Sequence, residues 1–155
     1  MVQNPFDPLA GRQGSRGAEE IVTERHALTL LPGMEETLAA IARDVETARR
    51  RVLVETYIHR DDRLGRAFGD ALVRAARRGV PTRLLYDPLG SQETNASFFD
   101  DLRLRGVQVR AYRPLRLALG EGTVWPRDHS RVLVLDDQAY TGGAAWGDEW
   151  LPRED

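Results

Sequence analysis

A histidine, an arginine and an aspartate surround one short apolar run near the end of the sequence. His129 and Arg131 flank Ser130 directly before this run, and Asp136 closes it. Because strand side chains alternate between two faces, residues 129 and 131 are expected on the same face. An imidazole beside a guanidinium would place a nucleophile next to a cation that holds phosphate oxygens. On spacing alone, the simpler interpretation is favoured, in which polar residues merely flank a buried strand.

Strand-like and helix-like patterns alternate along the chain and must position these residues. Apolar runs and alternation predict strands, whereas apolar residues at helical spacing predict amphipathic helices. The strands are expected over residues 21–31, 51–58, 82–87, 107–112, 131–136 and 138–143, and the helices over about 34–50, 64–75 and 98–105. This alternation predicts an α/β fold with a mainly parallel sheet, flanked by helices on both faces, and a hairpin near the end.

The length and composition fit one globular domain preceded by a tail. Residues 1–20 are rich in Gly, Pro, Gln and Arg without a period, which predicts a flexible N-terminal tail. Residues 21–155 are expected to form a single domain, because 155 residues suffice for one sizeable core but hardly for two.

Charge and residue usage narrow the possible partners. The net charge is −2, so no global positive field favours nucleic acid as a partner. Disulfides and thiolate metal sites are excluded because there is no cysteine. No apolar stretch approaches the roughly 20 residues that a membrane-spanning helix needs. All 22 basic residues are arginine, which indicates a chain-wide bias against lysine.

The segment around His129 resembles the H-x-K-x4-D motif of the phospholipase D superfamily. His129, Arg131 and Asp136 fall at the motif positions, and Gly142 and Gly143 follow where the family carries a pair of small residues. The resemblance continues through VETYIHRDDRLG (54–65), ALVRAARRGV (71–80), LLYDPLGS (84–91) and LRLRGVQVRAYRPLR (102–116). Over about residues 25–151 the chain is similar to the first half of the bacterial cardiolipin synthases, so a phospholipase D-like half-domain is expected.

The resemblance implies a phosphatidyltransferase that acts through a phosphohistidine and needs neither metal nor cofactor. It implies that His129 is the nucleophile or its acid/base partner, that Arg131 holds the phosphate, and that Asp136 supports the site electrostatically. Such a site needs a second copy of the motif. The expected partner is therefore a second phospholipase D-like half, in the same chain or in a homodimer mate, and the domain is expected to be truncated at its C-terminal end.

Further residues are candidates for binding substrate. Beside Gly142 and Gly143 these are Asp87, at the end of a predicted strand where parallel sheets form ligand sites, and Arg113. The latter belongs to a basic cluster with Arg110, Arg116 and Arg127, which could attract anionic head groups or, equally, nucleic-acid phosphates. The remaining candidates have plainer interpretations. His26 is expected to be structural or exposed, and His59 is expected at the surface. Asp61 and Asp62 are expected to form a helix cap rather than a metal pair, Asp148 and Glu149 a solvated turn or a buffer for His129, and Trp125, Trp146 and Trp150 packing contacts.

The resemblance also implies an anionic, phosphatidylglycerol-like substrate, peripheral contact with the membrane and a location in the cytoplasm or on the cytoplasmic face of a bacterial membrane.

Three departures from the family motif leave alternative functions open. Arg131 replaces the family lysine, five residues (137–141) stand where the family usually has six, and Ala145 replaces an asparagine. A homodimeric single-motif nuclease, or a degenerate non-catalytic half with a structural role, therefore remain as alternatives.

Overall fold

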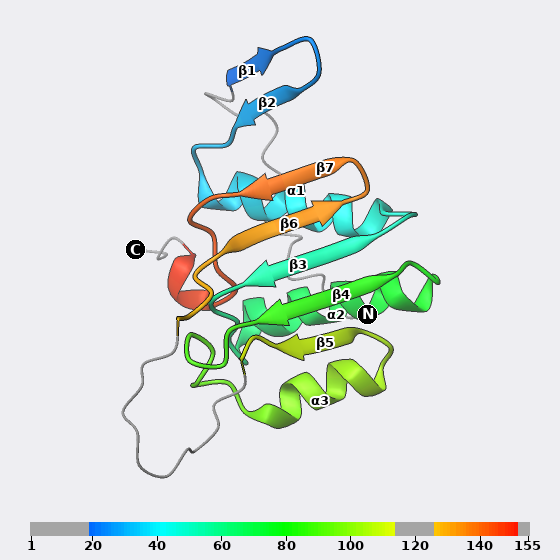
Figure 1. The fold of residues 1–155 in the computed structure, drawn as a ribbon, viewed down its shortest axis with the longest axis vertical. Helices are drawn as coiled ribbons and strands as arrows, with labels where there is room; N and C mark the ends of the chain where they lie inside the picture. Colours follow the sequence, from blue (N-terminus) through cyan, green and yellow to red (C-terminus); the bar gives the residue numbers. More distant parts are fainter. Residues whose placement is uncertain (1–18, 114–125, 152–155) are drawn as a thin grey trace.

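The computed structural model describes residues 19–113 and 126–151, which form a five-stranded sheet, a separate hairpin and three α-helices (Figure 1). The sheet has the strand order β5-β4-β3-β6-β7. These strands are β3 (Val52–Thr56), β4 (Thr82–Tyr86), β5 (Gln108–Ala111), β6 (Arg131–Leu135) and β7 (Gln138–Thr141).

The sheet is mixed, so the expectation of a mainly parallel sheet is wrong. Strands β3, β4 and β5 are parallel, because a helix carries the chain back between them. β6 runs antiparallel to β3, and β7 antiparallel to β6. β6 begins at the end of the sheet where β5 finishes, and a two-residue turn joins β6 to β7. Both connections force a reversal of direction.

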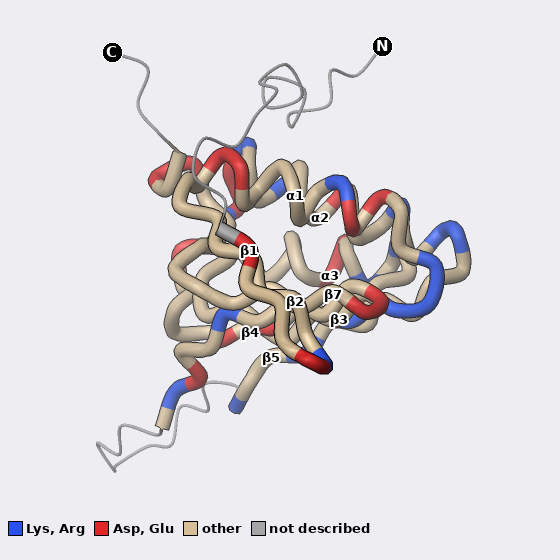
Figure 2. Tube along the Cα trace, turned by 90° about the horizontal axis from the view of Figure 1, so that it is seen from above, with Lys and Arg blue, Asp and Glu red and all other residues tan. Residues whose placement is uncertain are grey.

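All three helices lie on one face of the sheet, which corrects the expectation of helices on both faces for the described part of the chain. They are α1 (Met34–Thr47), α2 (Arg63–Arg77) and α3 (Ala96–Leu104). Figure 2 shows α1 and α2 on the same side of the strands. The ring of Phe99 in α3 stacks on Tyr86 of β4 at 3.7 Å, which places α3 on that side too. The sheet residues alternate accordingly: Val52, Val54 and Thr56 of β3 are buried, and the residues between them less so.

The core lies between this sheet face and the helices. It contains large, fully buried side chains from every layer: Leu38, Ile41, Phe68, Leu72, Leu84, Phe99, Leu102, Leu135 and Trp146. The ring of Trp146 stacks on that of Phe68 at 3.4 Å, so the prediction that this tryptophan packs internally is confirmed. Asp62 caps α2, as predicted, by accepting a hydrogen bond from the Gly65 N–H at 2.9 Å.

A hairpin replaces the single strand expected over residues 21–31. β1 (Glu19–Val22) pairs with β2 (Ala27–Leu30), and the Thr23 hydroxyl donates to the His26 carbonyl within the turn. β1 begins inside the predicted tail, and the rest of that tail lies outside the described residues. His26 is exposed, as expected. No described helix is both long and apolar enough to cross a bilayer.

Candidate active site

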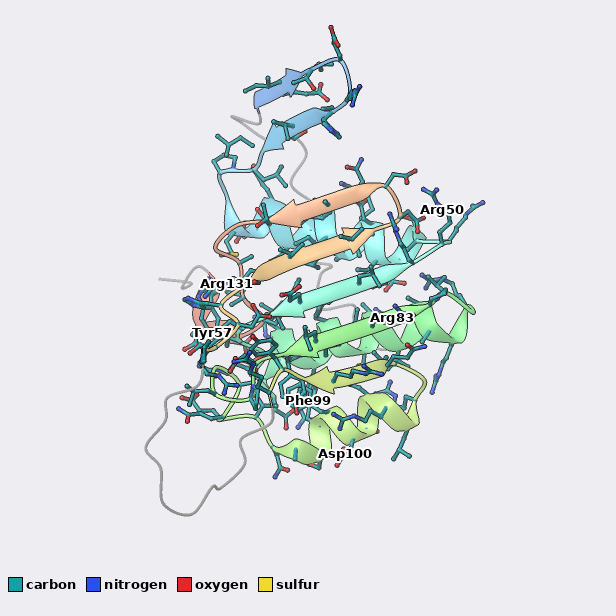
Figure 3. The ribbon with its side chains drawn as sticks, viewed as in Figure 1. Arg50, Tyr57, Arg83, Phe99, Asp100 and Arg131 are labelled. Carbon is teal, nitrogen blue, oxygen red and sulfur yellow. The ribbon has the colours of Figure 1, made fainter. Side chains whose placement is uncertain are left out.

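His129 and Arg131 come together at one end of the sheet, where β6 begins. Arg131 opens β6, and its Nη2 lies 3.3 Å from Nε2 of His129. A guanidinium can only donate, so this hydrogen bond requires the tautomer in which Nε2 accepts and Nδ1 carries the proton. In this tautomer Nε2 carries the lone pair that a nucleophile requires, and that lone pair faces the Arg131 guanidinium. The Tyr57 ring meets the imidazole edge to face, with centroids 4.2 Å apart. Figure 3 shows Tyr57 and Arg131 at this same end of the sheet.

The Arg131 side chain retains unused hydrogen-bonding capacity. Its Nε is buried and has no hydrogen-bond partner among the described residues. A buried donor without a partner is unfavourable by about 1–3 kcal/mol, and an anionic oxygen next to it would remove that penalty. Beside the lone pair of His129, this donor suits an oxygen of a phosphodiester.

The glycine pair, Gly142 and Gly143, lies at the same end of the sheet. Val132 pairs with Thr141 across β6 and β7, so Gly142 and Gly143 follow immediately beside the start of β6. The φ of Gly142 is +155°, which disfavours any side chain there. A Cβ on Gly143 would meet no atom within 4 Å, so there is open space beside this backbone. The structure therefore brings together His129, Arg131, Gly142 and Gly143.

Asp136 lies at the opposite end of β6. This strand is five residues long, so on the order of 15 Å separates its ends. In the turn to β7, Asp136 adopts φ +53° and accepts hydrogen bonds from the backbone N–H groups of Arg49, Arg50 and Arg51. These bonds lower its pKa to about 2. The contacts tie the β6–β7 turn to the start of β3, near the labelled Arg50 in Figure 3, and the structure does not bring Asp136 to His129.

Asp87 and Arg113 both lie near the motif but differ in exposure. Asp87 is 1% exposed, and its carboxylate accepts hydrogen bonds from Arg127 and from backbone N–H groups. Arg113 is exposed, has φ +41°, and places its guanidinium over the Tyr112 ring at 5.5 Å. Arg116 and Trp125, which the sequence also singled out, lie outside the described residues.

The structure reveals a carboxyl pair that sequence reasoning missed. A hydrogen bond from Glu55 to the Asp128 carboxylate, followed by burial, raises the pKa of Glu55. Burial opposes ionisation of Asp128, but hydrogen bonds from Ser130 and Glu55 outweigh it and lower the pKa of this carboxyl. The two carboxyls therefore interact beside the motif, where the pKa of Glu55 is raised and that of Asp128 is lowered. No sequence signal joins the two residues, because the pairing of β3 with β6 is a tertiary feature.

The acidic residues after the glycine pair do not contact His129. Asp148 accepts a hydrogen bond from the Leu64 N–H, at the start of α2, and Glu149 accepts one from Nε of Arg60. They hold residues 148–150 against α2 and the β3–α2 loop instead of buffering the imidazole. Among the described residues, no three His, Asp or Glu side chains are arranged to hold a metal ion.

His59 is buried, so the expectation of a surface histidine is wrong. It is 0% exposed, its Nε2 lies 3.0 Å from the Gly65 carbonyl oxygen, and its ring lies among Phe68, Phe98 and Phe99. The Nδ1 atom has no hydrogen-bond partner within the described ranges. Burial in this apolar environment lowers the pKa of His59 to about 4.

Acidification should therefore destabilise the domain through His59. The unfolded chain binds this proton near pH 6.5, the folded chain only near pH 4, so the stability is complete above about 6.5 and declines as pH falls towards 4. The difference corresponds to about 3 kcal/mol. Urea unfolding at about pH 7 and about pH 5 measures the free energy of unfolding. This free energy should fall less between the two pH values for His59→Leu than for wild type. His26→Gln, at an exposed position, serves as the control. Equal losses in wild type and His59→Leu would refute the assignment.

No protein-family model matches the sequence of this chain. It is 33% identical over 153 residues to the cardiolipin synthase of Geobacillus sp. (strain WCH70), which covers 98% of this chain. It is 33% identical to cardiolipin synthase 2 of Bacillus cereus over 88% of this chain, and 32% identical to the cardiolipin synthase of Geobacillus thermodenitrificans over 99%. The chain is a homologue of the cardiolipin synthases.

This homology confirms the resemblance to cardiolipin synthase-like members of the phospholipase D superfamily that the motifs indicate. The homologous chain spans about 30% of the length of these relatives. Likenesses among solved structures are weak. They include a polyphosphate kinase from Porphyromonas gingivalis, with a TM-score of 0.46 and 11% identity, and the archaeal chromatin protein TrmBL2, with a TM-score of 0.47 and 14% identity. These cover 73% and 88% of this chain, and 16% and 44% of the respective structures. Such low TM-scores carry no information about function.

Proposed function

We propose that this chain contributes one half of a phospholipase D-type phosphatidyltransferase site, in which His129 is the nucleophile. The observation that carries the proposal is the contact of 3.3 Å between Arg131 and Nε2 of His129, next to an Arg131 Nε that is buried without a partner. Homology to cardiolipin synthases supports the substrate class, an anionic phospholipid similar to phosphatidylglycerol. No cofactor or metal takes part.

The first chemical step forms a bond between Nε2 of His129 and phosphorus. The bond from phosphorus to the head-group oxygen breaks, and that oxygen takes a proton from an acid supplied by the second motif copy. Arg131 donates to the non-bridging oxygens, where negative charge develops in the transition state. In the second step the hydroxyl of another phosphatidylglycerol loses its proton to the same acid/base group and attacks phosphorus, and the bond to His129 breaks.

Two partners follow from this chemistry. One is the second motif copy, from a longer chain or a homodimer mate, and this chain together with that copy is here termed the paired protein. The other is the anionic surface of a bacterial membrane on its cytoplasmic side, contacted peripherally. The exposed Arg110 and Arg113 lie at and just beyond the C-terminal end of β5, at the end of the sheet that carries the motif. Their charge can attract this anionic surface.

The isolated chain should lack transferase activity, because one histidine attacks while another group must donate the proton. We expect residues 1–155, held as a monomer, to convert phosphatidylglycerol to cardiolipin no faster than a buffer blank. The paired protein should turn it over. The measurement is product formation in mixed micelles, with the oligomeric state determined by sedimentation.

Other results would point to the alternatives. Turnover by a monomer of residues 1–155 would overturn the need for a second motif. Cleavage of a DNA oligonucleotide by a dimer of this chain, without lipid turnover, would identify the single-motif nuclease. An active paired protein that is indifferent to His129 would identify a degenerate half.

A further inference from the structure

The buried Asp87 connects the catalytic motif to the rest of the sheet. It follows β4 directly, is 1% exposed, and accepts four hydrogen bonds at 2.8–3.2 Å, from the N–H groups of Leu89, Gly90 and Asp128 and from Nε of Arg127. Burial opposes ionisation, but these bonds outweigh it and lower the pKa of the carboxyl below its ordinary value. The Asp87 carboxylate is therefore a buried anion whose charge is compensated by hydrogen bonds from the protein itself. Such a group is not expected to bind an anionic substrate.

The first route from Asp87 to His129 runs along the chain. Arg127 and Asp128 directly precede His129, and both donate to the Oδ2 atom of Asp87 at 3.0 Å. The Nη2 atom of Arg127 also donates to the carbonyls of Tyr112 and Arg113, at 3.1 and 3.3 Å. The backbone before His129 is thus fixed to the ends of two neighbouring strands, β4 and β5.

A second route passes through the loop that follows β4. The Oδ1 atom of Asp87 holds the N–H groups of Leu89 and Gly90. Gly90 lies so close to Tyr57 that a Cβ on it would stand 2.3 Å from the Tyr57 carbonyl oxygen. The hydroxyl of Ser91 donates to the same carbonyl at 3.2 Å. The Tyr57 ring in turn meets the imidazole of His129.

We propose that Asp87, with Arg127, is a positioning residue that fixes the orientation of the His129 imidazole from both sides. This inference rests on the function proposed above, in which Nε2 of His129 must face phosphorus. It reassigns Asp87 from binding substrate to holding the nucleophile. Misplacing a reacting group by about 1 Å can lower a rate by roughly 100-fold, so the effect should appear in kcat.

The test replaces Asp87 by asparagine, which has the same shape but only one acceptor oxygen. The chain has three histidines, so their ring nitrogens can be followed individually by NMR in residues 1–155. We expect Asp87→Asn to displace both His129 ring signals while leaving those of His26 unchanged. In the paired protein it should lower kcat by about 10- to 100-fold and change KM by less than about 2-fold.

Asp62→Asn is the matched control, because Asp62 also accepts backbone hydrogen bonds, from Gly65 and Asp148, but at the start of α2. It should lower stability and leave the His129 signals in place. If Asp87→Asn does not fold, Arg127→Gln tests the same link and should give the same His129 displacement. Unchanged His129 signals in whichever of the two variants folds would overturn the inference. A wild-type paired protein without turnover would refute the proposed function alone, because the NMR result does not depend on activity.

Discussion

His129→Ala in the paired protein should lower the turnover of phosphatidylglycerol on the order of 10⁴-fold or more. Removing a nucleophile eliminates the covalent route, and the binding groups that remain supply only a small part of the rate. The loss should fall on kcat, because in the proposed function Arg131 and the backbone at Gly143 would still hold the phosphate. The measurement is steady-state formation of cardiolipin at saturating lipid.

His26→Ala is the control for this experiment, because His26 is exposed in the β1–β2 turn and is not part of the motif. It should retain wild-type turnover. Retention of more than about a tenth of the activity by His129→Ala would exclude a nucleophile at this position, since loss of a covalent catalyst is never so mild.

Arg131→Ala should remove about 2–4 kcal/mol of transition-state stabilisation, which is roughly a 30- to 1,000-fold loss of kcat. The guanidinium faces His129 and retains a buried, unpartnered Nε, so its charge is available to the phosphate oxygens. Arg131→Lys should keep much of the activity, because lysine is the residue that the family motif carries here. Steady-state kinetics of both variants in the paired protein decide the matter.

A matched control for the arginine comes from the opposite face of the sheet. Arg83 is exposed on β4, where its Nε donates to the side chain of Gln108. Arg83→Ala removes the same charge without touching the motif and should leave kcat unchanged. Equal activity of wild type and Arg131→Ala would contradict the role given to Arg131 and would favour a degenerate half.

The local pattern predicted the elements well, because it depends on neighbours along the chain. Three helices, the strands that flank the motif and the tight turn at Asp136 all follow from apolar periodicity and from Asp and Gly signals. The prediction of a mainly parallel sheet was wrong because the alternation of strands and helices does not give the direction of each strand. β6 begins at the end of the sheet where β5 finishes, so it runs antiparallel to β3.

Only the part of the site that lies along one strand could be predicted from the sequence. His129 and Arg131 lie two residues apart, so strand geometry alone places them side by side. Asp136 belongs to the same motif, yet the same geometry carries it to the far end of β6. The contacts of His129 with Tyr57, and the links to Asp87, depend on how strands β3, β4 and β6 pair, and that order cannot be read from periodicity.

The central claim, that His129 is the nucleophile, is tested most directly by trapping the intermediate. The paired protein is mixed with phosphatidylglycerol labelled in its phosphate, quenched within one turnover, digested, and mapped by mass spectrometry under conditions that preserve phosphohistidine. The account predicts label on the peptide that contains His129, as a phosphoramidate. Label confined to a residue of the second motif copy, with none on His129 during active turnover, would contradict it.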